Sequence, residues 1–285
     1  ENFRQDLFGG LSAGIVTLPV ALAYGVATGL GPIAGMYTAI ILGLIAVIFG
    51  GTDTQISSPV GAMTVVVAFI ISTEVTIAGS IDAALPVLIV MFALTGLIQM
   101  LMGLFKVGAN IRYVPYTVVS GFMSGIGIII MVLQVKDVFG VYDSGFKSVP
   151  SILMHFDYFV LNANWYSVLV SASTVGIIYL FPLITKRIPS SLIALIVVTS
   201  VVYFLKLDVH SLGEVEIHFS HFEMSFFDQI FQSEVMFRIV LAAFSLAVLG
   251  SINTLLTSVV ADKMTHTVHD SNKELFGQGL LNLVA

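Results

Sequence analysis

The chain contains no cysteine and few charged residues. Of its 285 residues, 10% are charged and 57% are hydrophobic, whereas a soluble domain carries about 25% charged residues. The missing cysteines exclude disulfides, thiolate catalysis and cysteine-bound metals. The net charge of −6 and the lack of basic clusters exclude a nucleic-acid-binding surface. These absences favour a membrane protein.

Long runs without charge set the expected architecture. From Leu7 to Thr52 no Asp, Glu, Lys or Arg occurs. A helix needs about 20 residues to cross about 30 Å of hydrocarbon, so this run is long enough for two spans, with the turn expected at Gly29, Gly31 and Pro32. Further uncharged windows, each long enough for one span, cover 54–73, 83–105, 113–135, 158–185, 188–205 and 239–261. We therefore predict an all-α polytopic membrane protein with eight spans.

A ninth apolar segment follows Glu274 and stops at Ala285. About 11 residues are too few to cross the hydrocarbon, so we expect the natural protein to continue. The first apolar run lacks the pattern of a cleavable signal peptide and is expected to remain as a span. Residues 1–285 are thus predicted to form one transmembrane domain in partial form.

The positions of lysine and arginine predict the orientation, because cytoplasmic loops are enriched in them. With a cytoplasmic N-terminus, the cytoplasmic side collects Arg4, Lys106, Arg112, Lys186, Arg187, Lys263 and Lys273. We therefore expect a multi-pass protein of the inner (plasma) membrane with its N-terminus in the cytoplasm. The alternating segment from Val215 to Phe222 predicts a short external strand or hairpin. His and Glu residues of the same loop lack metalloprotease spacing, which favours a solvated acidic surface over an enzyme centre.

The third span has an unusual start. Residues 55–64 precede a run from Val65 to Ile71 that is too short to cross the bilayer, which predicts a half-helix beginning near the midplane. We expect Ser57 or Ser58 to cap it and Pro59 to lie in its first turn. The free N–H groups at such a start carry partial positive charge and favour an anion. The alternative is a polar loop between spans two and three.

Two other spans carry polar or helix-breaking residues. Pro19 lies inside the first span and predicts a break or bend, with Tyr24 five residues further on. Tyr24 either presents its hydroxyl to a cavity or packs. Asn253 and Thr257 are four residues apart and share a face of the eighth span. They face a ligand, or they join helices by hydrogen bonds.

Several sequence blocks follow one another along the whole chain, from Asp6 to Pro19, Ala21 to Gly25, Gly50 to Thr52, Ser57 to Gly61, Ser251 to Thr257, Val260 to Asp262, His269 to Leu275 and Gly277 to Gly279. In this order and spacing they resemble the sulfate permease family of inorganic-anion transporters. Among the members, the chain looks most like the cyanobacterial sodium-dependent bicarbonate transporters and their bacterial relatives.

This resemblance implies a fold of two inverted repeats of seven helices, with half-helices at the midplane. The chain would hold the first repeat and the start of the second. The rest of the second repeat and the C-terminal cytoplasmic STAS domain would lie outside it. The implied activity is secondary active transport of bicarbonate or sulfate by alternating access, without enzymatic chemistry, in a protein that pairs as a homodimer.

The resemblance also implies the site residues. The anion would contact Tyr24, Val60, Gly61, Ala62, Met63 and Thr64, and Asn253 and Thr257 would be candidates for a coupling Na⁺. The sodium-coupled bicarbonate transporters of this family carry Asp at the position of Asn253, and an amide offers a cation its oxygen but no charge. Val20 stands where many relatives have Gln. The alternatives are a nucleobase-type transporter of the same fold and a membrane protein that senses anions or voltage without transport.

Overall fold

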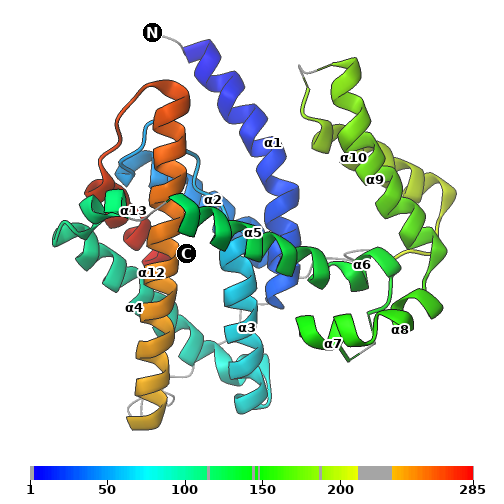
Figure 1. Cartoon of the computed structure of the whole chain (residues 1–285), viewed down its shortest axis with the longest axis horizontal. Coiled ribbons are helices and arrows are strands. Elements are labelled where there is room, and N and C mark those ends of the chain that lie inside the picture. Colours follow the sequence, from blue (N-terminus) through cyan, green and yellow to red (C-terminus); the bar gives the residue numbers. More distant parts are fainter. Residues whose placement is uncertain are drawn as a thin grey trace. The chain divides into compact units, whose positions relative to one another are not determined.

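The described secondary structure is entirely helical. The computed structural model describes residues 3–113, 116–142, 145–146, 148–185, 188–210 and 233–284. Its helices are α1 (Phe3–Thr28), α2 (Pro32–Phe49), α3 (Gly61–Ala78), α4 (Ile81–Leu104), the 3₁₀ helix η1 (Val107–Tyr113), α5 (Tyr116–Leu133), α6 (Val135–Phe139), α7 (Val149–Met154), α8 (Phe156–Leu161), α9 (Trp165–Ile184), α10 (Ser190–Leu205), α12 (Ser233–Thr265) and α13 (Ser271–Val284) (Figure 1). The all-α prediction is confirmed for these residues. The strand expected within 215–222 lies outside them.

Six of the described helices, α1, α2, α3, α4, α9 and α12, are long and apolar enough to cross a membrane. They account for six of the eight predicted spans. The window 188–205 forms the shorter apolar helix α10, of 16 residues, and the window 113–135 contains η1 residues and α5. These lengths and compositions make the chain a multi-pass membrane protein.

The chain divides into two compact units, residues 1–17 with 123–214 and residues 18–122 with 215–285. In the first unit α9 and α10 pack side by side (Figure 1), and α6 contacts both α8 and α9. Val141, Ile152 and Phe159 form a buried hydrophobic cluster in this unit. The second unit contains the C-terminal part of α1 with α2, α3, α4, α12 and α13.

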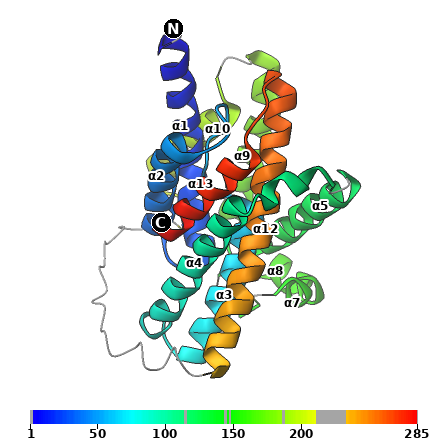
Figure 2. The same cartoon turned by 90° about the vertical axis from the view of Figure 1, so that its left-hand side faces the viewer.

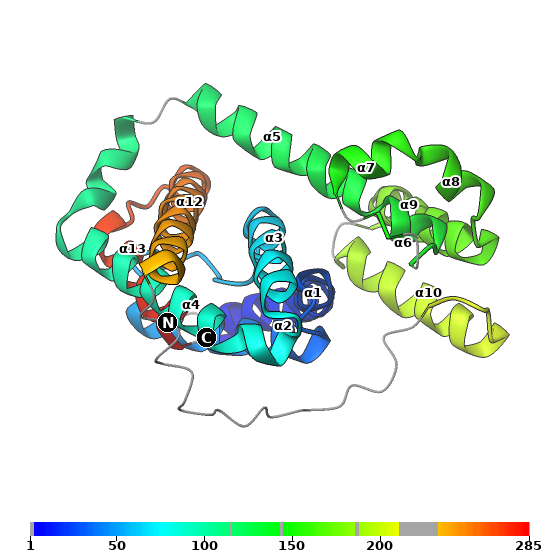
Figure 3. The same ribbon diagram turned by 90° about the horizontal axis from the view of Figure 1, so that it is seen from below.

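In the second unit α13 packs against α4 and α2 (Figure 2). The α4–α13 contact is close because glycines face the opposite backbone: a Cβ on Gly96 would lie 2.5 Å from the carbonyl oxygen of Gly279. The helices α3 and α12 also contact each other, and both are seen nearly end on in Figure 3. These contacts bring segments from both ends of the chain into one unit.

The first two helices join as the sequence predicts. Gly29 and Gly31 have φ of +81° and +91°, values that favour glycine, and Pro32 occupies the first turn of α2. Of the break or bend predicted at Pro19, the break is wrong, since α1 continues through this residue as one helix of 26 residues. Pro19 removes one backbone hydrogen bond, and the bonds of the neighbouring turns carry the helix through.

The third helix is longer than predicted. It spans 18 residues and continues past Val65–Ile71 through Glu74, whose buried carboxylate pairs with Arg238 of α12. The sequence places both charges outside the spans, but their pairing allows the helices to extend over them. The predicted cap is also wrong: Val60 is the N-cap, and no side chain caps the helix.

Candidate functional site

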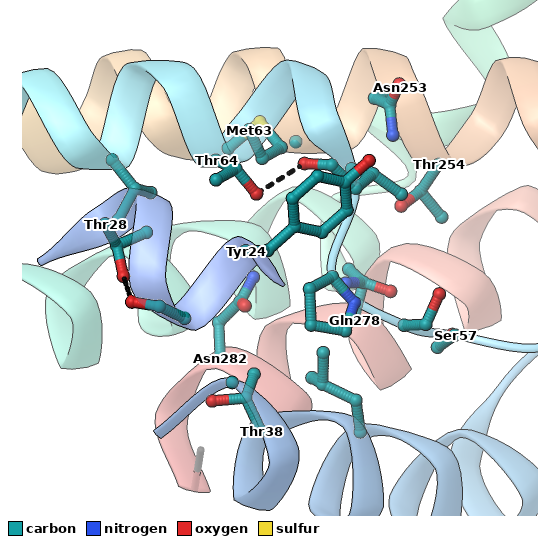
Figure 4. A pocket seen from close by; sticks show the side chains of 18 of the residues that line it. Tyr24, Thr28, Thr38, Ser57, Met63, Thr64, Asn253, Thr254, Gln278 and Asn282 are labelled. Atoms are coloured by element: carbon teal, nitrogen blue, oxygen red, sulfur yellow. Dashed lines mark hydrogen bonds between the residues drawn. The ribbon is translucent and has the colours of Figure 1, made fainter. Parts of the chain in front are cut away.

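The second unit contains a cavity of about 420 Å³ (Figure 4). Its walls come from the end of α1, from α2, residues 55–60, the first turns of α3, and from α4, α12 and α13. Among the described residues that line it there is no Asp, Glu, Lys, Arg or His. Hydroxyl groups, side-chain amides and backbone groups are therefore the polar groups that this cavity offers.

The amino end of α3 opens on the cavity through Val60, Met63 and Thr64. Val60 is extended, with φ −121° and ψ 142°, and its carbonyl oxygen accepts from the N–H of Thr64 at 2.9 Å and from its hydroxyl at 3.0 Å. The N–H groups of the first helical turn have no partner within the helix. This end carries about half a positive charge and suits an anion. Pro59 and Ser57 precede it in the wall.

Most of the residues expected at the site line this one cavity. They are Tyr24, Val60, Met63, Thr64, Asn253 and Thr257. Figure 4 shows the ring of Tyr24 extending from α1 into the cavity. Gly61 and Ala62 do not line it, because the first turn of α3 directs Met63 and Thr64 toward the cavity, and Ala62 is buried.

Asn253, on α12, is the most buried side-chain amide in the cavity wall. Its exposed fraction is 8%, and its side chain hydrogen-bonds to no other described residue (Figure 4). Thr257 donates its hydroxyl to the carbonyl oxygen of Asn253 at 2.9 Å, which leaves the lone pairs of its oxygen available. A buried amide without a partner is unfavourable unless the cavity contents supply one.

The sequence interpretation missed the contribution of α13. Gln278 and Asn282 line the cavity from this helix, and Thr38 lines it from α2. Gln278 and Asn282 are four residues apart within an apolar segment, so their shared helix face was the available signal. The segment was interpreted only as the start of a further span.

A hydrogen-bond network around Glu274 anchors the segment between α2 and α3. Glu274, 3% exposed, accepts from the N–H of Gly51 at 2.8 Å and from the hydroxyl of Thr52 at 3.0 Å. Ser258 donates to Oε1 of Gln55 at 2.8 Å, and its hydroxyl lies 2.9 Å from that of Thr52. Gln55 lines the cavity. The network therefore fixes the wall that leads into α3.

A second polar cluster joins α12 to α13 away from the cavity. Oδ2 of Asp262 accepts from the backbone N–H of His269 at 3.1 Å and lies 2.6 Å from its Nδ1. Nε2 of His269 is 2.8 Å from the hydroxyl oxygen of Ser271. None of the three lines the cavity, and the described residues contain no group of three or more His, Cys, Asp or Glu side chains able to hold a metal. The cluster fixes the connection between the two helices.

Comparison with known proteins gives consistent matches. Residues 3–285 match the model of the sulfate permease family. The bicarbonate transporter BicA of Picosynechococcus sp. is 40% identical over 289 residues, which cover 99% of this chain and 50% of that protein. The putative sulfate transporter YvdB of Bacillus subtilis is 30% identical over 295 residues, covering 100% of this chain and 52% of that protein.

A solved structure extends the comparison to the fold. The transmembrane domain of a cyanobacterial bicarbonate transporter BicA matches with a TM-score of 0.88 and 40% identity, covering 100% of this chain and 72% of that one. The match confirms the fold class expected from the sequence. The chain spans about half the length of the curated relatives it matches.

Proposed function

The chain belongs to the sulfate permease family, and from this membership we propose that the protein carries a small inorganic anion, bicarbonate or sulfate, across the membrane. Relatives named as a bicarbonate transporter and a putative sulfate transporter support this class of substrate. The anion binds in the cavity of the second unit, next to the amino end of α3.

The absence of charged side chains among the described residues of the cavity wall carries this proposal. The uncapped start of α3 supplies N–H groups and partial positive charge, and Tyr24 supplies a hydroxyl. The hydroxyl of Thr64 donates to the anion when it exchanges its bond to the carbonyl oxygen of Val60 for one to the anion. A cavity with fixed cations would hold an anion tightly, whereas dipoles and hydroxyls bind it weakly enough for release on the other side. Transport by alternating access requires such release.

Asn253 and Thr257 form the proposed site for a coupling Na⁺. Both line the cavity and offer oxygen atoms, the amide carbonyl of Asn253 and the hydroxyl of Thr257. Oxygen ligands suit hard cations. Because neither residue carries charge, sodium binding there would depend on the anion beside it for charge balance.

The proposed setting is the plasma membrane, with the N-terminus in the cytoplasm and two copies of the protein in a dimer. The distribution of lysine and arginine supports the orientation. Crosslinking in membranes tests the dimer, and labelling of single introduced cysteines tests the orientation, since residues 1–285 contain no cysteine that would compete for the label.

Uptake by the full-length protein in liposomes tests the function. We expect uptake of labelled bicarbonate or sulfate, measured with and without an inward sodium gradient. Thr64→Val removes a hydroxyl from the cavity and should lower uptake by roughly three- to tenfold. The matched control is Thr76→Val on the same helix, because Thr76 is exposed and its hydroxyl makes the same type of bond, to the carbonyl of Ser72.

Four results would contradict parts of the proposal. Equal uptake by the parent and Thr64→Val proteins would show that the anion does not bind at the start of α3. Charge displacement without uptake would instead indicate a sensor, and uptake of a nucleobase alone would indicate a different cargo. Sodium-independent uptake that becomes sodium-dependent in Asn253→Asp would mean that the native amide does not couple sodium.

A further inference from the structure

Two short helices, α7 and α8, are held beside the start of α9 (Figure 3). The backbone N–H of Asn164, the N-cap of α9, donates to the carbonyl oxygen of Phe139 on α6 at 2.8 Å. Phe139 packs against a buried cluster that contains Ile152 of α7 and Phe159 of α8. All these residues belong to the first unit. The two helices therefore lie at the end of α9 where this apolar span, Trp165–Ile184, begins.

The side chain of Asn164 shows that α10 ends at the same level. Its Nδ2 donates at 2.7 Å to the carbonyl oxygen of Asp208, three residues beyond the end of α10. Its Oδ1 accepts from the N–H groups of Tyr166 and Ser167 at 3.0 and 3.4 Å. Lys206, directly after α10, and Asp208 are exposed charged residues. Because charges are costly in hydrocarbon, this level marks one boundary of the membrane.

The helices α7 and α8 expose large apolar side chains although their own core is complete. Ile152 and Phe159 are fully buried, whereas Met154 is 79% exposed, Leu161 is 82% exposed and Trp165, at the start of α9, is 68% exposed. Three more apolar or aromatic side chains of this stretch are exposed, those of Leu153, Phe156 and Tyr166. Contact of these groups with water is unfavourable, so they call for an apolar environment.

The composition of this stretch identifies the environment as lipid. From Ser148 to Thr185 the sequence contains one charged residue, Asp157. The exposed apolar residues of α7 and α8 thus continue along the chain into the apolar span α9. Exposed Trp165 and Tyr166 stand at the junction, and tryptophan and tyrosine are enriched where hydrocarbon meets the lipid headgroups. Their rings are apolar, while their N–H and O–H groups bind water.

We infer that α7 and α8 form an interfacial element that lies in the headgroup region of the bilayer, with Met154 and Leu161 in contact with acyl chains. Short helices with apolar side chains insert at this depth without crossing the membrane. Through Asn164, such an element fixes the level at which α9 and α10 meet the membrane boundary. The inference concerns lipid as the partner of this surface and does not depend on which solute the protein carries.

Spin labels on single cysteines test this placement in the full-length protein in liposomes. Residues 1–285 contain no cysteine, and any cysteine elsewhere in the protein is first replaced by serine. Met154→Cys and Leu161→Cys carry the label at the proposed lipid contacts. The measurement compares the accessibility of each label to oxygen, which concentrates in hydrocarbon, with its accessibility to a nickel chelate that stays in water.

Two matched positions calibrate the measurement. Lys206→Cys places the label at an exposed site at the end of α10, where water should reach it. Val175→Cys places it in the middle of α9, at a residue that is exposed along an apolar span. The ratio of oxygen to nickel accessibility at positions 154 and 161 should lie between the ratios at these two controls. Leu153→Cys carries the same expectation should either labelled protein fail to fold, as judged by size-exclusion chromatography.

Two results would overturn the inference. Labels at positions 154 and 161 that are as accessible to the nickel chelate as the label at position 206 would place α7 and α8 in water. Labels that neither oxygen nor the nickel chelate reaches would show that protein covers this surface, either a second copy or another part of the same protein.

Discussion

Glu74 and Arg238 form an ion pair between α3 and α12, with Oε1 of Glu74 2.9 Å from Nε of Arg238. The side chain of Glu74 is 5% exposed and that of Arg238 is 37% exposed. Near the opposite end of α3, Met63 approaches Gly250 of α12. The two contacts show that the helices run antiparallel, and the ion pair holds the end of α3 that lies away from the cavity.

The unequal burial of this pair predicts unequal effects of its removal. Arg238→Met leaves a buried carboxylate without its partner and should lower the free energy of unfolding by about 3 kcal/mol. Glu74→Gln leaves a cation that water reaches, so its effect should be about 1 kcal/mol. Denaturant unfolding in detergent micelles measures both, with Lys263→Met, an exposed site on α12, as control. Equal losses would show that the carboxylate does not depend on this partner.

Glu274 should tolerate an amide better than an apolar side chain. One oxygen, Oε2, accepts both hydrogen bonds, from Gly51 and Thr52. Glu274→Gln keeps such an oxygen, whereas Glu274→Leu leaves the N–H of Gly51 unpaired and should lower the free energy of unfolding by about 1–3 kcal/mol. Hydrogen exchange at Gly51 provides the measurement, since it should accelerate only in the leucine variant. Acceleration of similar size in both variants would mean that the charge itself holds the loop.

Close backbone packing predicts opposite effects for two Gly→Ala substitutions. A Cβ on Gly96 would meet the backbone of α13 at 2.5 Å, so Gly96→Ala should force α4 and α13 apart and lower the melting temperature. A Cβ on Gly43 of α2 has nothing within 4 Å, so Gly43→Ala should be neutral or stabilising by up to about 1 kcal/mol. Thermal unfolding of the two variants measures the contrast. A Gly96→Ala protein as stable as the parent would contradict the described α4–α13 contact.

Burial raises the pKa of Asp137 on α6, and the charges of Lys136 and His210 partly offset this effect. A raised pKa means that folding disfavours the ionised form, so the contribution of Asp137 to stability falls as pH rises through its pKa. Asp137→Asn should therefore unfold at a higher temperature than the parent at pH 7, and the gap should close below about pH 4.

Asp157→Asn on the exposed side of α8 is the control for this pH dependence. Thermal unfolding from pH 3.5 to 7.5 (about four pH units) covers the ordinary range of a carboxyl group and a raised one. A stability gap for Asp137→Asn that stays constant with pH would show that lost packing, not charge, determines its effect.

Local backbone chemistry made part of the fold predictable from sequence. Gly29, Gly31 and Pro32 mark the first turn because positive φ favours glycine and a first helical turn favours proline. The prediction of a break at Pro19 was wrong because one missing backbone hydrogen bond does not end a helix whose other hydrogen bonds persist. The full length of α3 depends on a partner more than 160 positions away, Arg238, and local sequence carries no sign of that pairing.

The candidate site was predictable where one helix carries its own signal. The spacing of Asn253 and Thr257 and the start of α3 identified residues that line one cavity. The position of Asn282 in the cavity wall depends on how α13 packs against α4. Gly96 and Gly279 allow that close contact only when both helices are present. No periodic pattern in the sequence predicts tertiary packing of this kind.

The uncharged lining of the cavity also determines how transport should respond to acidity. The described lining contains no carboxylate, imidazole or ammonium group, the groups that gain or lose protons near neutral pH. The electrostatic potential set by this wall therefore stays constant as the surrounding pH changes. If the proposed transport holds, a change in uptake near neutral pH should arise from protonation of the substrate in solution or from groups outside the described lining. For bicarbonate, the rate should follow the concentration of the monoanion.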